Sequence, residues 1–568
     1  MADATERLTV AQALVRLLRA EDVRNAYGVV GGKLAPLLQA IAGSSIRYTG
    51  VRHEASASMM AAAEFAATGR VALAFGEMGP GGLNLASGAG VAYANRLAAL
   101  FVTTNQHRAA AYPHLGMFMD LDTRAVFAPV TKWNAVVHDG RRLPELVRTA
   151  FREALGGAPG PVHLDIPQDV LAQSLDWPAG TFDVAPSRSR AVHRPRPAAA
   201  AVDEAAGLLR AARRPLVVAG GGVVAADATD QVRSLAARLG APVVPTQMAL
   251  GVVASDSPHF IGHGGIIAGE PVRLAFEGAD VVLAVGCRHS SWMWDAQGAL
   301  ARPGHALVNV NVDASALGSP ALHTVALQAD ARAALDDLLA ALDGGVPAAA
   351  PGWLASLRAA RATHVARLAE MARDTAMPMH PAMLATELGA ALPADALAVY
   401  DGGHTTFWSN DLTPVQAPRT RFHEPGMSHL GFGLPYALAV QRLHPGRPVV
   451  LITGDGSFGF TLQELDTARR ERLPVVTVIH DNASWGIIRE GQRKQDFELG
   501  TSLAGTDYAA VARGFGCHGE IVERPGELAP ALARAFASGL PAVIDARVRF
   551  VPHPATPAFG SMNRYGSV

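Results

Sequence analysis

The chain is poor in several features that would define its class at once. It has two cysteines, Cys287 and Cys517, far apart in 568 residues, which argues against a disulfide framework or a cysteine metal site and fits a reducing cytoplasm. No apolar run reaches the roughly 20 residues that span a membrane. The N-terminal stretch MADATERLTVAQALVRLL carries acids early and lacks the long apolar core of a secretory signal.

The chain also lacks an excess of charge of either sign. The 49 Lys and Arg residues nearly balance the 50 Asp and Glu residues, so the formal net charge is −1. Nothing in this balance indicates a nucleic-acid partner or an anionic membrane. What the chain has is apolar content, with 49% hydrophobic and 17% charged residues, which is ample for large cores. A chain of this length predicts about three domains.

Strand and helix patterns alternate along the chain and predict three α/β units. The units are expected at residues 1–185, 199–342 and 375–550, with linkers at 186–198 and 343–352 and a tail at 551–568. One helical face, opened by a predicted cap at Thr9, contains Val10, Ala13, Leu14, Leu17 and Leu18. Strands are predicted at 26–30, 71–76, 100–104, 162–167, 215–220, 241–246, 280–286, 307–313, 397–401, 449–453, 475–479 and 542–548.

The stretch from 447 to 482 reads as strand, loop, helix and strand. The apolar run PVVLIT stops at GDGS (454–457), a helix is expected over 461–472, and the strand PVVTVIH follows. Because two parallel strands end at the same edge of a sheet, Asp455 and Asn482 are expected where open α/β sheets bind ligands. A carboxylate and an amide oxygen, with open positions left over, suit a magnesium ion that also takes phosphate oxygens.

This spacing resembles the signature of thiamine-diphosphate enzymes, which is GDG followed after some two dozen residues by Asn-Asn. Here 24 residues separate GDG from Asp481-Asn482. The second asparagine of the pair is the ligand in the family, and Asn482 retains it. The resemblance therefore implies thiamine diphosphate and Mg²⁺ as cofactors, with Asp455, the Asn482 side chain and the Ser484 backbone carbonyl as metal ligands.

The first unit holds Glu54, after Val51-Arg52-His53 and before a helix of small residues. This arrangement resembles the acetolactate-synthase-like branch of thiamine-diphosphate enzymes, in which a glutamate bonds to the aminopyrimidine ring and activates the cofactor. The resemblance implies that Glu54 is catalytic. Further matching motifs are GVVGGK (28–33, with Val30 in place of a proline), GPGGLN (79–84), PVTKWN (129–134), PGPVHLDIPQDV (159–170), DGGHT (401–405) and SHLGFGLP (428–435).

The resemblance covers essentially the whole chain and implies an α/β fold of three doubly wound parallel-sheet domains, namely pyrimidine-binding, middle and diphosphate-binding. In this family the first domain of one subunit faces the third domain of another, which implies a homodimer at least, commonly a tetramer. The middle domain of relatives binds FAD, binds ADP or is empty; Arg288 matches a family arginine and Ala158 replaces another, so these options stay open. The implied cofactor-binding residues are Gly31, Gly32, His404, Thr405, Ser428, Leu430, Gly456 and Ser457.

Departures from acetolactate synthases bear on the reaction. Those enzymes have Phe-Gln-Glu where this chain has Phe118-Met119-Asp120, and Met119 cannot replace the hydrogen bonds of the glutamine. They have Gln-Trp where this chain has Glu490-Gly491. Gly491 enlarges the substrate pocket, and Glu490 resembles the glutamate that pyruvate-decarboxylase-type enzymes use for proton transfer.

These departures lead to the main prediction, a thiamine-diphosphate-dependent carbon–carbon lyase. It would cleave a 2-hydroxyacyl-CoA-type substrate through a carbanion–enamine intermediate, with Glu490 as the acid–base group. The neighbouring Arg489, Arg493 and Lys494 are expected either to hold a CoA phosphate or to form a solvated basic loop. The predicted substrate residues thus include Phe118 and Met119 besides this cluster and Gly491.

Two other reactions remain as alternatives, a 2-oxo acid decarboxylase and an acetolactate-synthase-like carboligase. A non-catalytic homologue is a weaker alternative, because Glu54, Asp455 and Asn482 are all present. The tail at 551–568 is expected to close over the substrate as a lid, with Arg564 contacting an anionic group. Permanent packing of the tail on a neighbouring subunit is the competing interpretation.

Overall fold

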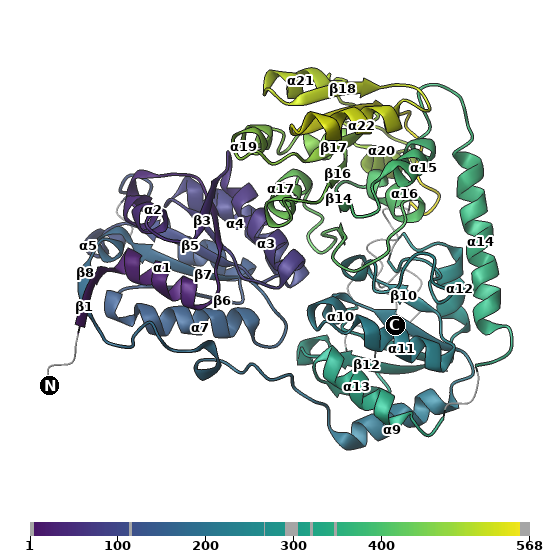
Figure 1. Ribbon diagram of the computed structural model, residues 1–568, viewed down its shortest axis with the longest axis horizontal. Helices are drawn as coiled ribbons and strands as arrows, with labels where there is room; N and C mark the ends of the chain where they lie inside the picture. The colour runs from purple at the N-terminus through teal and green to yellow at the C-terminus, as the bar shows by residue number, and fades with distance from the viewer. Residues whose placement is uncertain are drawn as a thin grey trace. The chain divides into compact units, whose positions relative to one another are not determined.

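The computed structural model describes residues 5–112, 116–265, 267–289, 305–318, 322–345 and 349–556. The chain divides into two compact units, each considered separately below (Figure 1). Unit 1 contains residues 1–193 together with 426–445 and 461–473, and unit 2 contains 194–425, 446–460 and 474–568. Two helices of the third domain, α17 (Gly433–Leu443) and α19 (Glu464–Arg470), therefore belong to unit 1.

The first domain is built on a six-stranded parallel sheet of order β3-β2-β4-β5-β7-β6. Figure 1 shows α1 and α7 on one side of this sheet and α3 and α4 on the other. The predicted cap of α1 is confirmed, since Thr9 Oγ1 accepts the Gln12 amide at 3.2 Å, and the predicted apolar face of α1 is buried. The strands are β2 (Asn25–Gly28), β3 (Arg47–Gly50), β4 (Leu73–Gly76), β5 (Leu100–Asn105), β6 (Trp133–Val136) and β7 (Val162–Pro167), and a separate antiparallel pair joins β1 (Thr5–Thr9) to β8 (Ser174–Pro178). The helices are α1 (Val10–Ala20), α2 (Ala35–Ala42), α3 (Glu54–Thr68), α4 (Pro80–Asn95), α5 (Arg108–Ala111), α6 (Thr123–Phe127), α7 (Leu143–Leu155) and α8 (Gln168–Leu171).

The third domain repeats the strand order of the first domain, as β15-β14-β16-β17-β19-β18. Its strands are β14 (Leu397–Tyr400), β15 (Arg421–Phe422), β16 (Val449–Gly454), β17 (Val476–Asp481), β18 (His518–Val522) and β19 (Ala542–Arg547). Besides α17 and α19, its helices are α15 (Pro381–Ala391), α16 (His404–Leu412), α18 (Asp455–Phe458), α20 (Gly486–Arg493), α21 (Tyr508–Gly514) and α22 (Leu528–Ser538). The similar layout of the first and third domains is therefore a repeated topology.

The middle domain has a five-stranded parallel sheet of order β10-β9-β11-β12-β13. Its strands are β9 (Pro215–Ala219), β10 (Val243–Pro245), β11 (Val281–Val285), β12 (Ala306–Asn311) and β13 (Val325–Gln328). Its helices are α9 (Ala199–Ala211), α10 (Gly221–Ala225), α11 (Thr229–Leu239), α12 (Glu270–Gly278) and α13 (Ala331–Ala341). Helix α14 (Trp353–Met371) follows, and its first residue is tied to this domain because Trp353 Nε1 donates to Pro215 O at 3.0 Å.

The prediction of three parallel-sheet α/β domains is confirmed, because every strand pair within the three large sheets is parallel. Two local predictions are wrong. Residues 455–458 form a helical turn, α18, rather than a loop, and the helix expected over 461–472 is α19, which spans 464–470. No helix in the described parts of the chain is both long and apolar enough to cross a membrane.

Candidate active site

The strand order of the first and third domains defines one ligand crevice in each. In the third domain, β14 is followed by β15 on one side of the sheet order and β16 is followed by β17 on the other, so the connections after β14 and β16 run in opposite directions. The loops after β14 and β16 therefore flank a switch point, where open α/β sheets bind ligands. The loops after β2 and β4 do the same in the first domain. The predicted cofactor residues 404–405 and 456–457, and 31–32, lie in or directly after these loops.

The two loops of the third domain lie in close contact at this switch point. Gly402 has a φ of +98°, a conformation that favours glycine. A Cβ atom at this position would lie 3.1 Å from Ser457 Oγ and 3.4 Å from the Gly454 nitrogen. Gly456 faces the Trp485 ring, to which an added Cβ would approach within 2.6 Å. Glycine at 456 is thus required by the close approach of Trp485, and not by a positive φ.

The three predicted metal ligands meet at the ends of β16 and β17. Asp455 Oδ2 accepts the Ser484 amide at 3.0 Å, and Asn482 Oδ1 accepts the Ser484 hydroxyl at 2.8 Å. Burial raises the pKa of Asp455 to about 7, and the negative charge of Asp481 adds to this rise. A divalent cation would relieve both effects, and this set of oxygen atoms suits Mg²⁺.

Asp481, which replaces the first asparagine of the family signature, is buried and has a cationic partner. Arg547 at the end of β19 donates to its Oδ2, and the Ala483 amide donates to its Oδ1 at 2.9 Å. Arg547 also pairs with Asp545 at 2.8 Å. Burial, followed by the charge of Asp481, raises the pKa of Asp545 to about 7. One guanidinium therefore pairs with two buried carboxylates, Asp481 and Asp545, close to the predicted ligand Asp455.

His404, the first residue of α16, contributes an unpaired ring nitrogen to this region. Its Nε2 lies 3.0 Å from Thr556 Oγ1, whereas its buried Nδ1 has no hydrogen-bond partner in the described parts of the chain. A Cβ at Gly486 would lie 3.2 Å from this Nδ1 and 3.3 Å from Asn482 Nδ2, so the histidine borders the predicted metal ligands. Burial lowers the pKa of His404 to about 3, so the ring is neutral near pH 7. A neutral imidazole with one free nitrogen can bind a phosphate oxygen beside the metal. The neighbouring Thr405 is buried as well.

Glu54 is the first residue of α3 and is half-buried. Its Oε2 accepts Asn84 Nδ2 at 3.0 Å, and a Cβ at Gly81 would lie 3.2 Å from its Oε1. Asn84 of the GPGGLN motif thus orients the Glu54 carboxylate, and Gly81 of the same motif leaves room for it because it has no side chain. Oε1 has no hydrogen-bond donor within the described residues, so it is free to bind a ligand.

The loop after β2 carries Gly31 and Gly32. A Cβ at Gly31 would lie 1.6 Å from Glu77 Oε2, so this glycine is required by the close approach of Glu77. Glu77 Oε1 accepts the Lys33 amide at 3.2 Å. Gly32, in contrast, is exposed with open space around its α-carbon. This loop is therefore held by a carboxylate that lies at the switch point of the first sheet.

The predicted substrate residues Phe118 and Met119 lie beside the same loop. Lys33 Nζ lies 5.4 Å from the Phe118 ring centroid, and Phe118 is 80% exposed. Met119 has a left-handed φ of +64°, and a Cβ at Gly79 would lie 2.9 Å from its carbonyl oxygen. An exposed aromatic ring and a thioether are thus presented next to the glycine turn that contacts Glu54.

Ser428 and Leu430 lie in the segment before α17, within unit 1. Ser428 is exposed and has a left-handed φ of +50°, which is uncommon for a residue other than glycine. Leu430 is half-buried. The segment is anchored to α4 by a contact of 2.9 Å between His429 Nε2 and Ser87 Oγ.

Each cation of the basic cluster on and directly after α20 has an acidic partner within the chain. Arg489 and Arg493 both pair with Glu498, at 2.7 and 3.1 Å, and their guanidinium groups lie 5.2 and 5.1 Å from the Phe550 ring centroid. Lys494 Nζ lies 3.3 Å from Glu490 Oε1 and donates to Thr556 O at 3.1 Å. These pairings disfavour a phosphate-binding surface. Gly491 is buried in the same helix.

Comparisons with known proteins agree with this geometry. Residues 8–126, 202–338 and 401–546 match the N-terminal TPP binding domain, the central domain and the C-terminal TPP binding domain of thiamine pyrophosphate enzymes, respectively. The chain belongs to the thiamine pyrophosphate enzymes. It is therefore an enzyme that uses thiamine pyrophosphate, which is also called thiamine diphosphate.

Three relatives indicate the range of reactions. The chain is 33% identical over 519 residues to the probable 2-ketoarginine decarboxylase AruI of Pseudomonas aeruginosa, covering 90% of this chain and 89% of the relative. It is 28% identical over 551 residues to a probable acetolactate synthase large subunit of Methanocaldococcus jannaschii (94% and 91% covered). It is 29% identical over 530 residues to the acetolactate synthase isozyme 2 large subunit of Escherichia coli (92% of each). These similarities favour the decarboxylase and carboligase alternatives over the predicted 2-hydroxyacyl-CoA lyase.

The C-terminal tail and the middle domain carry further predicted sites. Arg564 and the rest of 557–568 lie outside the described residues, while His553 and Thr556 are buried in unit 2. In the middle domain, a Cβ at Gly220 would lie 2.3 Å from Gly286 O, so the two loops at that switch point pack backbone against backbone. An adenine nucleotide there, the lid, the oligomer and the cytoplasmic location stay predictions.

Binding of thiamine diphosphate with Mg²⁺ is expected to strengthen as the pH rises from about 6 to 8. Without metal, the pKa of Asp455 is raised from 3.8 to about 7, so near pH 6 the cation must displace a proton. Because the fold favours the protonated form, this group makes the metal-free enzyme less stable as the pH rises toward 7. The dissociation constant and the thermal shift, measured across this range, check both signs.

The Asp455→Asn variant is the control for this pH dependence, because thiamine diphosphate itself titrates. Its residual binding should change less with pH than that of the wild type. Equal pH dependence in the two proteins would contradict the account.

Sequence reasoning missed Arg547 of unit 2 and Glu77 and Glu464 of unit 1. Arg547 and Glu77 are single charged residues at strand ends, and no sequence motif marks them. The one signal for Arg547 was Asp481, because an aspartate in place of the family's asparagine requires a compensating cation when it is buried. Glu464 lies on α19, where an acidic residue resembles any solvated helix face. In the structure its side chain is completely buried.

Proposed function

We propose that the enzyme decarboxylates a 2-oxo acid to the aldehyde with one carbon fewer. The observation that carries this proposal is the placement of Glu490 on α20, directly after the turn that holds Asn482 and Ser484. The Glu490 side chain is 16% exposed and lies 3.3 Å from Lys494 Nζ. Decarboxylation replaces a carbon–carbon bond by a carbon–hydrogen bond, so a proton must be delivered at the carbon that loses carbon dioxide. The Glu490–Lys494 pair can hold and supply that proton.

Residues of each unit suit the cofactor. Asp455, Asn482 and Ser484 would hold Mg²⁺, His404 and Ser457 border the place for a diphosphate, and thiamine diphosphate supplies a nucleophilic carbon and an electron sink when bound. Glu54 would hold a proton shared with the aminopyrimidine ring. The paired state of Arg489, Arg493 and Lys494 supports a substrate without CoA.

Carboligation of the acetolactate-synthase type is the second candidate. The observation that favours it is the similarity to acetolactate synthases over more than 90% of the chain, at 28–29% identity. Met119, which lacks the hydrogen-bonding capacity of glutamine, and Gly491, which lacks the side chain of the tryptophan that acetolactate synthases have at this position, weigh against it. Decarboxylation therefore stands first.

A 2-oxo acid with a cationic side chain is the first substrate to test. The relative named probable 2-ketoarginine decarboxylase suggests a guanidino group. Glu77 supports this choice, because its carboxylate lies at the switch point of the first sheet and has no ion-pair partner within the described residues. A guanidinium would pair with such a carboxylate in a bidentate manner.

A substrate panel tests this proposal. Full-length enzyme with thiamine diphosphate and Mg²⁺ is given 5-guanidino-2-oxopentanoate, its neutral isostere 5-ureido-2-oxopentanoate, pyruvate and 2-hydroxyacyl-CoA thioesters. The proposal expects aldehyde and carbon dioxide from the guanidino acid, with a lower kcat/KM for the ureido acid. Cleavage of the thioesters alone would overturn it.

Glu490→Gln is expected to lower kcat by about 10²–10⁴-fold, the usual contribution of a general acid–base group. Glutamine keeps the shape but cannot carry the proton, so release of aldehyde should slow more than consumption of the first 2-oxo acid molecule. Rapid-quench measurement of a single turnover separates the two steps. Glu498→Gln, which disturbs the pairs with Arg489 and Arg493 and the hydrogen bond from Thr501, is the matched control and should retain most turnover. Equal effects of the two variants would argue against a proton-transfer role for Glu490.

A further inference from the structure

The backbone that leads into Glu54 determines where its carboxylate lies. Only residues 51–53 separate the end of β3 from Glu54, the first residue of α3. The first amide groups of a helix have no partner within the helix. The His53 Nδ1 accepts one of them, from Ala55 at 3.2 Å. The Glu54 side chain faces Asn84 instead, so the catalytic residue does not anchor its own helix terminus.

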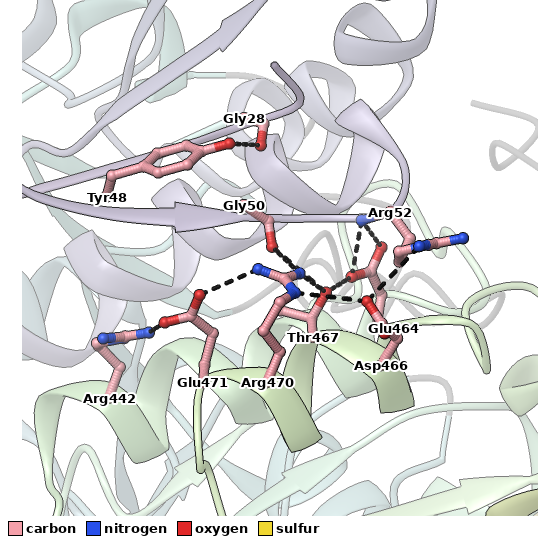
Figure 2. A network of polar contacts seen from close by, with 10 residues as sticks. All are labelled: Gly28, Tyr48, Gly50, Arg52, Arg442, Glu464, Asp466, Thr467, Arg470 and Glu471. Atoms are coloured by element: carbon pink, nitrogen blue, oxygen red, sulfur yellow. Dashed lines mark hydrogen bonds and ion pairs between the residues drawn. The ribbon is translucent and has the colours of Figure 1, made fainter. Parts of the chain in front are cut away.

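An acidic residue more than 400 positions later supplies the missing anchor. Both carboxylate oxygens of Glu464, on α19, accept the Arg52 amide, at 3.1 and 3.2 Å (Figure 2). The Thr467 hydroxyl donates to Glu464 Oε2 at 2.6 Å and so orients the carboxylate. The Arg52 amide is thus held two residues before Glu54.

A second contact from α19 holds the other end of this connection. Arg470 donates to Gly50 O, the last carbonyl of β3, at 2.6 Å, and Glu471 accepts from Arg470 at 3.1 Å. Figure 2 shows that Arg442 pairs with Glu471 from the other side. A Cβ at Gly50 would lie 2.9 Å from Tyr48 Oη, so Tyr48 leaves no room for a side chain at this position. The connection from β3 to α3 is therefore held at Gly50 and at Arg52 by contacts from one helix.

Burying the carboxylate of Glu464 costs free energy, which a residue with a packing role alone would avoid. Its side chain is completely buried, and an ionised carboxylate without donors is strongly unfavourable there. Burial raises its pKa, which the Thr467 hydroxyl and the amides of Arg52 and His53 oppose. A hydrogen bond from an amide to a carboxylate is stronger than one to a neutral acceptor. The carboxylate thus holds the Arg52 amide more rigidly than an uncharged side chain would.

We propose that Glu464 is a positioning residue for the cofactor-activating Glu54, acting through the Arg52 amide. This inference rests on the catalytic role of Glu54 in the proposed function. A misplacement of about 1 Å can cost roughly 10²-fold in rate. Removing the Glu464 charge should therefore impair cofactor activation while the fold and the metal site are kept.

Glu464→Gln tests this role, because glutamine keeps the size of the side chain. Two quantities are measured: exchange of the thiazolium carbon proton of bound thiamine diphosphate, and amide exchange of a peptide spanning residues 50–56 in the cofactor-free protein. The expected results are a roughly 10–10²-fold slower thiazolium exchange and faster amide exchange in that peptide. Cofactor affinity and Tm should stay near the wild-type values. Glu464→Asp, which keeps the charge, should recover part of the thiazolium exchange rate.

Asp466→Asn is the matched control, since it removes a charge from the same helix that pairs with the side chains of Arg52 at 3.7 Å and Arg470 at 3.5 Å, and it leaves Glu464 and Arg470 themselves in place. It should leave both exchange rates unchanged. Wild-type exchange rates in Glu464→Gln, or a loss of cofactor affinity and Tm in parallel with the rates, would overturn the proposal. Thiazolium exchange needs no 2-oxo acid, so a wrong substrate assignment does not affect the test. If the wild type itself shows no thiazolium exchange, the proposed function fails, and the amide exchange still decides the role of Glu464.

Discussion

Glu54→Gln is expected to lower turnover by about 10²–10⁴-fold, as is usual for general acid–base groups. Glutamine is isosteric and can keep the hydrogen bond from Asn84, so the fold and cofactor binding should persist. It cannot share a proton with the aminopyrimidine ring, so exchange of the thiazolium proton should slow together with turnover. Steady-state kinetics and proton exchange, measured on the same preparation, check this prediction.

Glu64→Gln is the matched control for this prediction. Glu64 lies on the same helix, is buried and accepts hydrogen bonds from Asn25 and Tyr27 at 2.9–3.0 Å. Its substitution should change stability and leave thiazolium exchange intact. Turnover of Glu54→Gln within about twofold of the wild type would contradict the role of Glu54, because the acid–base contribution is at least about 10²-fold.

Asp455→Ala is expected to abolish retention of thiamine diphosphate, because the metal loses its charged ligand. At a cofactor concentration about 100 times Kd, binding stabilises the wild type by about 2.7 kcal/mol, and this Mg²⁺-dependent stabilisation should vanish. The metal-free variant should not be less stable than metal-free wild type near pH 8. The reason is that the raised pKa of Asp455 marks its ionised form as unfavourable in the empty fold.

Thermal unfolding with and without cofactor and Mg²⁺ measures this effect. Asp466→Ala, on the half-exposed side of α19, is the control and should keep the full ligand-induced shift. A shift that survives unchanged in Asp455→Ala would show that Asp455 is not a metal ligand.

The central strands were predictable because burial on both faces leaves continuous apolar runs. The run PLVVA, for example, within the strand predicted at 215–220, forms β9 (Pro215–Ala219). Most strands at sheet edges lack this signal, and the edge strands β3, β6, β13, β15 and β18 were missed, whereas the buried edge strand β10 was predicted. The edge strand β3 reads RYTG, and its burial changes from exposed to buried along its length, so no period is visible in four residues. Helix α14 was missed because its apolar residues follow no single face.

The candidate site could be predicted as far as motif residues follow strand ends. Asp455, Asn482 and Ser484 are brought together as the spacing indicates, since β16 and β17 are neighbours. Long-range pairings could not be predicted. The contact of Arg547 with Asp481 and that of Glu464 with the Arg52 amide join residues 66 and 412 positions apart, and a single charged residue does not indicate its partner. The pairing of Arg489 and Arg493 with Glu498 could not be predicted either, and it disfavours the phosphate-binding role that the basic cluster suggested.

The product balance of the full-length enzyme tests the central claim most directly. The enzyme is supplied with 5-guanidino-2-oxopentanoate, thiamine diphosphate and Mg²⁺ in deuterated water, and carbon dioxide and aldehyde are measured together. The account predicts one aldehyde for each carbon dioxide released, with one deuterium at the aldehyde carbon and no product without thiamine diphosphate. Carbon dioxide release accompanied by a coupled 2-hydroxy-2-acyl acid instead of the aldehyde would contradict it.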